Sequence, residues 1–162
     1  MNARATDSPF DPDRILVIGY GNELRGDDAA GRFLAQRIAT WRLPGVRVLS
    51  VRQLTPELAA EVPGGALVLF ADAIEAGDSE TAPRIRPVTP SGESSRSHHC
   101  GPAEILSLAE RLYGEVALGA VVSIPGEQFG WGRRLSPTAQ TNLEEALILS
   151  RNLIDARQLA AQ

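Results

Sequence analysis

Three features are scarce in this sequence: cysteine, clustered basic residues and long apolar runs. Cys100 is the single cysteine among 162 residues, so no disulfide can form within the chain, and we expect a reducing, cytoplasmic setting. The formal net charge is −4 and no long basic run is present, which argues against nucleic acid as a partner. Because no apolar run reaches the roughly 18–20 residues that span a bilayer, we expect no membrane partner either.

Composition and length indicate one domain. Hydrophobic residues make up 43% of the chain and charged residues 22%, which is ordinary for a globular protein. A chain of 162 residues is long enough to bury a core. We expect residues 1–13, which lack the apolar core of a signal peptide, to be a mobile N-terminal tail, and residues 14–160 to form a single domain.

Apolar runs recur along the chain and predict strands. Their β-rich composition and flanking glycine or proline favour buried strands at residues 15–18, 46–51, 66–71 and 117–124. A weaker run at 84–88 contains Pro87 and follows Pro83, and proline cannot donate to a central ladder. We therefore expect this fifth strand at an edge of the sheet.

Helical patterns alternate with these strands. Apolar residues spaced three and four apart predict a helix starting at Ala29, another over 105–112 and a long one after Ser136. Thr55 and Pro56 predict the start of a short helix, with threonine as the cap and proline in the first helical position. This alternation predicts an α/β fold: a three-layer α/β/α sandwich around a mostly parallel, about five-stranded twisted sheet.

Carboxylates follow two of the buried strands. Asp27 and Asp28 lie in the stretch RILVIGYGNELRGDDAAG, on the turn from the first strand to the first helix, and Asp72 comes where the third strand is expected to end. Because the carboxyl ends of parallel strands share one edge of a sheet, Asp28 and Asp72 are expected to converge. The alternative role for such an aspartate is capping a helix, which is the favoured interpretation for Asp27.

His98 and His99 are the only histidines and precede the helix predicted over 105–112. An imidazole and two carboxylates form a plausible three-ligand site for a divalent transition metal, with positions left open for substrate or water. The alternative is two solvated loop histidines. Cys100 is a candidate soft ligand or nucleophile, although a lone cysteine in an intracellular chain is more often neither.

The glycines of the first turn resemble a dinucleotide-binding fingerprint but do not match it. Leu24 occupies the position of the required third glycine, and Asp28 would repel a pyrophosphate. A P-loop and a G-x-S-x-G nucleophile elbow are both absent. We interpret Gly19 and Gly21 as residues that let the backbone turn tightly at the edge of the sheet.

Three motifs together resemble the hydrogenase maturation proteases. They are GYGNELRGDDAAG after an apolar strand, FADA at the end of the third strand, and SHH ahead of a helix. The first matches G-x-G-N-x-L-x-x-D-[DE]-x-x-G and is quite specific, whereas the other two depend on their order and spacing. The resemblance extends from Arg14 through the segment VSIPGEQF into the last helix.

This resemblance implies an endopeptidase that removes the C-terminal extension of a nickel-loaded [NiFe] hydrogenase large-subunit precursor. It places the metal-contacting carboxylates on Asp28 and Asp72, which are also the catalytic candidates, and the metal-contacting histidine on His99 rather than His98. The implied metal is nickel carried by the precursor, which serves as the recognition element, and no organic cofactor is implied.

Several points stay open at this level. The peptide bond can be attacked by water activated by a carboxylate or by a metal-bound hydroxide, and Asp27 and Glu127 are further carboxylates expected near the active edge. Gln53-Leu54-Thr55 stands where many members have Asp-Gly-Gly or Asp-Gly-Thr, which indicates a distinct subgroup. The other candidate functions are a non-catalytic nickel-binding maturation chaperone and a nucleotide-binding α/β domain.

Overall fold

The computed structural model describes residues 15–91, 100–114 and 117–161. The expected tail at residues 1–13 lies outside the described residues. None of the described helices is long and apolar enough to cross a membrane.

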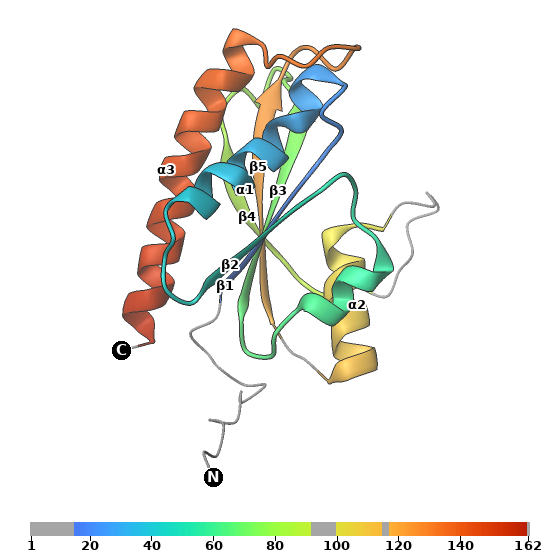
Figure 1. Ribbon diagram of the computed structural model, residues 1–162, viewed down its shortest axis with the longest axis vertical. Coiled ribbons are helices and arrows are strands. Elements are labelled where there is room, and N and C mark those ends of the chain that lie inside the picture. The colour runs from blue at the N-terminus through green and yellow to red at the C-terminus, as the bar shows by residue number, and fades with distance from the viewer. Residues whose placement is uncertain (1–14, 92–99, 115–116, 162) are drawn as a thin grey trace.

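One five-stranded sheet organises the molecule (Figure 1). Its order is β2-β1-β3-β5-β4, and every neighbouring pair is parallel except β4 and β5, which are antiparallel. The predicted α/β class and mostly parallel sheet are therefore confirmed, including the edge position of the strand that contains Pro87. The strands are β1 (Ile15–Tyr20), β2 (Val46–Val51), β3 (Leu67–Glu75), β4 (Arg84–Val88) and β5 (Leu118–Gly126).

Helices cover both faces of the sheet, as the alternation predicts (Figure 1). One face packs against α1 (Ala30–Thr40) and α3 (Pro137–Ala160), and the other against α2 (Pro102–Tyr113) and the 3-10 helix η2 (Pro56–Glu61). The central strands contribute to both cores because successive side chains of a strand point to opposite faces. In β1, for example, Ile15 and Val17 join the α1–α3 core, while Leu16 and Ile18 join the α2 core.

The helix starts differ from the expectation in two places. A separate 3-10 helix, η1 (Gly26–Ala29), precedes α1, which begins at Ala30. Pro56 occupies the first turn of η2 as expected, but the Thr55 side chain makes no capping hydrogen bond. The expected threonine cap is therefore wrong. Ser136 does cap α3, because its hydroxyl accepts a hydrogen bond from the N–H of Ala139 at 3.1 Å.

The third strand is longer than predicted, and this changes the position of Asp72. β3 continues to Glu75 because β5 supplies backbone partners throughout, from Asp72 opposite Ser123 to Glu75 opposite Gly126. On its other side, β3 loses its neighbour earlier, since the last pair with β1 is Gly19 opposite Ala71. Asp72 therefore lies inside a strand, one residue past the ladder with β1, rather than in a loop.

Small residues allow α1 to approach the ends of β1 and β3 closely. A Cβ on Gly19 would overlap the carbonyl oxygen of Gly31, and a Cβ on Gly31 would overlap the carbonyl oxygen of Ala71. These two glycines allow the backbone of α1 to contact the backbone of the strands directly where the chain leaves the sheet. The turn that carries Asp28 is fixed on this close contact.

We predict that Gly31→Ala lowers the free energy of unfolding by about 1–3 kcal/mol, because the added methyl group overpacks this contact. The loss should occur although alanine is the better helix former by about 1 kcal/mol. Urea denaturation followed by circular dichroism measures the difference. Gly77→Ala is the control, since a Cβ there meets nothing within 4 Å. Equal stability of the two variants would contradict the close contact.

Candidate functional site

The turn after β1 is built by hydrogen bonds within the chain. Gly21 has a positive φ of 141°, and its N–H donates to the carbonyl of Arg52 at the end of β2, at 3.2 Å. The Asn22 side chain accepts from the N–H of Leu24 at 3.0 Å. The N–H of Asn22 donates to Oδ2 of Asp28 at 2.7 Å. The carboxylate of Asp28 is therefore held against its own turn.

Asp28 and Asp72 line the same cleft, as predicted. The cleft has a volume of about 740 Å³ and lies between the ends of β1, β2 and β3. Oδ1 of Asp28 has no hydrogen-bond partner among the described residues, so it is available to a metal ion or to water. The lining residues are Tyr20, Gly21, Asn22, Arg25, Asp28, Arg52, Gln53, Leu54, Thr55, Pro56, Asp72 and Cys100.

The charged form of Asp72 is disfavoured in this cleft. Burial raises the pKa of Asp72 to about 6; the hydrogen bond from the Tyr20 hydroxyl works against this rise, and the charge of Asp28 adds to it. Burial and the adjacent Asp72 carboxylate likewise raise the pKa of Tyr20, so its hydroxyl remains a donor. Sequence reasoning missed Tyr20, although its position at the end of β1 already placed it on the active edge.

Asp27 has a different role from the helix cap that was expected. It is fully buried, and its carboxylate accepts hydrogen bonds from the N–H groups of Glu127 (2.8 Å), Gln128 (2.9 Å) and Ser136 (2.7 Å) and from the Ser136 hydroxyl (2.6 Å). It makes no capping bond to η1. The capping prediction is wrong because these four donors, about a hundred residues away in sequence, compete for the carboxylate.

The environment of Asp27 keeps it ionised. Burial is the largest single effect and raises the pKa of Asp27, but the hydrogen bonds from Ser136, Gln128 and Glu127 together lower that pKa below its ordinary value. Gly126 leaves room for this arrangement, since a Cβ there would come within 2.6 Å of the Cβ of Asp27. Asp27 thus ties η1 to the loop after β5 and to the start of α3.

The other candidate residues have different outcomes. His98 and His99 lie outside the described residues, so the predicted histidine ligand stays a prediction. Among residues 15–91, 100–114 and 117–161, no three His, Cys, Asp or Glu side chains form a metal-binding group. Cys100 lines the cleft, but burial and then the charges of Glu104 and Glu57 raise the pKa of its thiol, which disfavours a thiolate. Glu127 is exposed and does not line the cleft.

Comparison with solved structures identifies similar proteins. The hydrogenase maturating endopeptidase HybD from E. coli matches at a TM-score of 0.71 and 25% identity, over 88% of this chain and 93% of that chain. The [NiFe] hydrogenase maturation protease HycI from Thermococcus kodakarensis matches at 0.66 and 26%, over 88% and 93%. An endopeptidase from Escherichia coli matches at 0.64 and 26%, over 85% and 89%. No protein-family model and no curated protein sequence matches the chain.

The chain thus has the fold of solved hydrogenase maturation endopeptidases. The resemblance that the three motifs predict is confirmed across about 88% of the chain, and the neighbours support peptidase activity.

We predict that Asp27→Asn lowers the free energy of unfolding by about 2–4 kcal/mol at neutral pH. The amide offers one acceptor oxygen to four donors and turns its NH₂ group toward some of them. The loss should shrink as the pH falls from about 4, where an aspartate of the unfolded chain becomes protonated, through the lower pKa that Asp27 has in the folded protein. Denaturation curves of both proteins against pH measure this. Asp78→Asn, on an exposed turn, is the control, and equal losses in both variants would contradict the role of Asp27.

We predict that Asp72→Asn, in contrast, raises the free energy of unfolding, measured with a chelator present. The pKa of Asp72 is raised from 3.8 to about 6, so its charge costs stability fully above about pH 6 and not at all well below pH 4. The variant should gain about 1–3 kcal/mol at pH 7.5 and little at pH 3.5. The asparagine oxygen can still accept from Tyr20. A variant less stable than wild type at pH 7.5 would contradict the electrostatic cost.

Proposed function

We propose that this protein removes the C-terminal extension of a nickel-loaded [NiFe] hydrogenase large-subunit precursor. The convergence of Asp28 and Asp72 in one cleft is the observation that carries the proposal. Fold neighbours named as hydrogenase maturation endopeptidases supply the reaction class. Nickel belongs to the substrate in this proposal, and the carboxylates of the cleft recognise the substrate by binding this nickel.

The two carboxylates fit a divalent cation. They lie together in a partly buried cleft, and the charge of Asp28 disfavours that of Asp72, so a cation between them would relieve the repulsion. Hard oxygen donors combined with one imidazole form a ligand set that suits nickel, and His99 is the proposed third ligand. Precursor without nickel would lack these bonds and would bind less tightly. Bound nickel would therefore distinguish the precursor that is ready for cleavage.

The proposal assigns distinct tasks to the residues of the cleft. Asp28 lines the cleft and binds its own turn through Oδ2 alone among the described residues, so it can hold cargo metal or take a proton from an attacking water. Tyr20 orients Asp72 through the hydroxyl hydrogen bond. Asp27 holds the turn in place without entering the cleft and is a positioning residue.

We predict that Asp28→Asn and His99→Ala fold normally but process nickel-loaded precursor at least about 100-fold more slowly, because each removes a group that acts on the bound substrate. His98→Ala should be milder. Mass spectrometry of the released C-terminal peptide, after incubation of purified protein with purified precursor, measures the rate.

Controls distinguish this proposal from its alternative. Asp78→Asn, on the exposed turn, should process the precursor at the wild-type rate. Wild-type protein that binds the nickel-loaded precursor without releasing a peptide would instead indicate a nickel-binding maturation chaperone. Normal processing of the precursor by the Asp28 variant would contradict the proposed site.

A further inference from the structure

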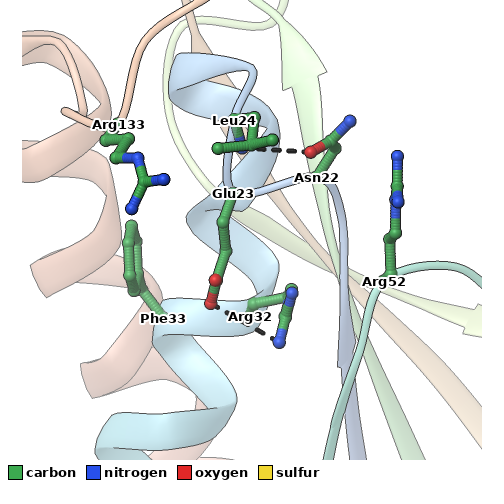
Figure 2. Close-up of a pocket in the computed structure, with 7 residues that line it drawn as sticks. All are labelled: Asn22, Glu23, Leu24, Arg32, Phe33, Arg52 and Arg133. Atoms are coloured by element: carbon green, nitrogen blue, oxygen red, sulfur yellow. Dashed lines mark hydrogen bonds and ion pairs between the residues drawn. The ribbon is translucent and has the colours of Figure 1, made fainter.

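A second groove of about 410 Å³ adjoins the cleft of Asp28 and Asp72 (Figure 2). Asn22 and Arg52 line both, so a polypeptide bound in one can continue into the other. Four segments contribute to the groove: the turn before η1, the helix α1, the residue after β2, and the loop after β5. Its lining residues are Asn22, Glu23, Leu24, Arg32, Phe33, Arg52 and Arg133.

The groove is positive although the chain is negative overall. It has three arginines and one glutamate, on a protein with a formal net charge of −4. Glu23 already forms an ion pair with Arg32 at 3.4 Å and accepts a hydrogen bond from Gln36 at 3.3 Å. Arg52 and Arg133 are exposed and make no side-chain hydrogen bond or ion pair with any of the described residues.

Arg52 and Arg133 flank an apolar surface. Figure 2 shows Arg52 and Arg133 on opposite sides of the groove, with Leu24 between them and Phe33 below Arg133. Leu24 is 39% exposed, so its side chain offers apolar surface to a ligand in the groove. A ligand that fits this groove carries negative charge at two separated points and an apolar group between them.

A carboxylate-bearing peptide fits better than a phosphate compound. Phosphate sites in such folds use free backbone N–H groups at a turn or helix start. Here the N–H of Asn22 donates to Asp28 and that of Leu24 donates to the Asn22 side chain. The charged donors of the groove are guanidinium groups, whose fork geometry matches carboxylates in a bidentate manner.

We propose that this groove binds an acidic segment of the substrate polypeptide next to the scissile bond. Acidic side chains of that segment pair with Arg52 and Arg133, and an apolar side chain packs on Leu24 and Phe33. The inference rests on the proposed function, because it takes the substrate to enter through the adjoining cleft. The groove would select the precursor by charge and orient its chain, since complementary charge sets partner choice and register.

The direct test uses peptides and no cleavage. An acetylated, amidated hexapeptide of sequence GEALEG should shift the amide NMR signals of Leu24 and Phe33 in the full-length protein. The matched GQALQG peptide should bind at least about fivefold more weakly. Added salt should weaken the binding of the acidic peptide only. The double variant Arg52→Gln/Arg133→Gln should lose the preference, whereas Arg111→Gln, an exposed arginine on α2, should keep it.

Equal binding of the two peptides, shifts confined to other surfaces, no shift at millimolar peptide, or a preference retained by the double variant would each overturn the inference. An acidic peptide with a free C-terminus that binds while its amidated form does not would also overturn it, because the groove would then read a chain end rather than side chains.

Precursor cleavage separates this inference from the proposed function. The double variant should raise the KM for nickel-loaded precursor about fivefold and change kcat less. Wild-type kinetics in that variant would overturn the groove inference and leave the proposed peptidase intact. Absence of cleavage by the wild type, with preferential binding of the acidic peptide, would instead overturn the peptidase and leave a site for acidic polypeptide.

Discussion

The structure of the site depends on the buried carboxylate of Asp27. It accepts four hydrogen bonds from residues at or beyond the end of β5, and its own N–H donates to the carbonyl of Gln128 at 2.7 Å. Together with the backbone bridge between Arg25 and Gly132, these bonds connect the turn after β1 to the loop after β5. A burial that would be costly for an unpaired charge is stabilising here because both oxygens of the carboxylate accept hydrogen bonds.

Two adjacent aspartates thereby have opposite roles. In the 3-10 helix η1, successive side chains project in directions about 120° apart, so Asp27 can point into the protein while Asp28 faces the cleft. The low pKa of Asp27 reflects saturation with donors. Asp28 instead shares its cleft with Asp72, whose pKa is raised mainly by burial and further by the charge of Asp28. A site that destabilises its own carboxylate is typical of function rather than folding.

The layers of this fold follow from sequence patterns because burial repeats at a regular spacing. The alternation of Ile15 and Val17 with Leu16 and Ile18 already indicates a strand covered on both faces. The convergence of Asp28 and Asp72 follows from the shared edge of parallel strands.

What the patterns could not predict depends on long-range partners. The inclusion of Asp72 in β3 requires β5 to extend equally far, and the role of Asp27 requires donors that lie about a hundred residues later. The Thr55 side chain makes no capping hydrogen bond to η2, which shows that a favourable residue type at a helix start does not ensure the cap. Arg52 and Arg133 come from segments whose proximity no local pattern encodes.

The central claim is that Asp28 and Asp72 act together on one metal ion. Anomalous diffraction from crystals of the wild-type protein soaked with cadmium, a surrogate for nickel, tests this most directly. The account predicts one ion bound by the carboxylates of Asp28 and Asp72 and by the imidazole of His99. Cadmium bound only elsewhere, with no ion between the two carboxylates at saturating concentration, would contradict it.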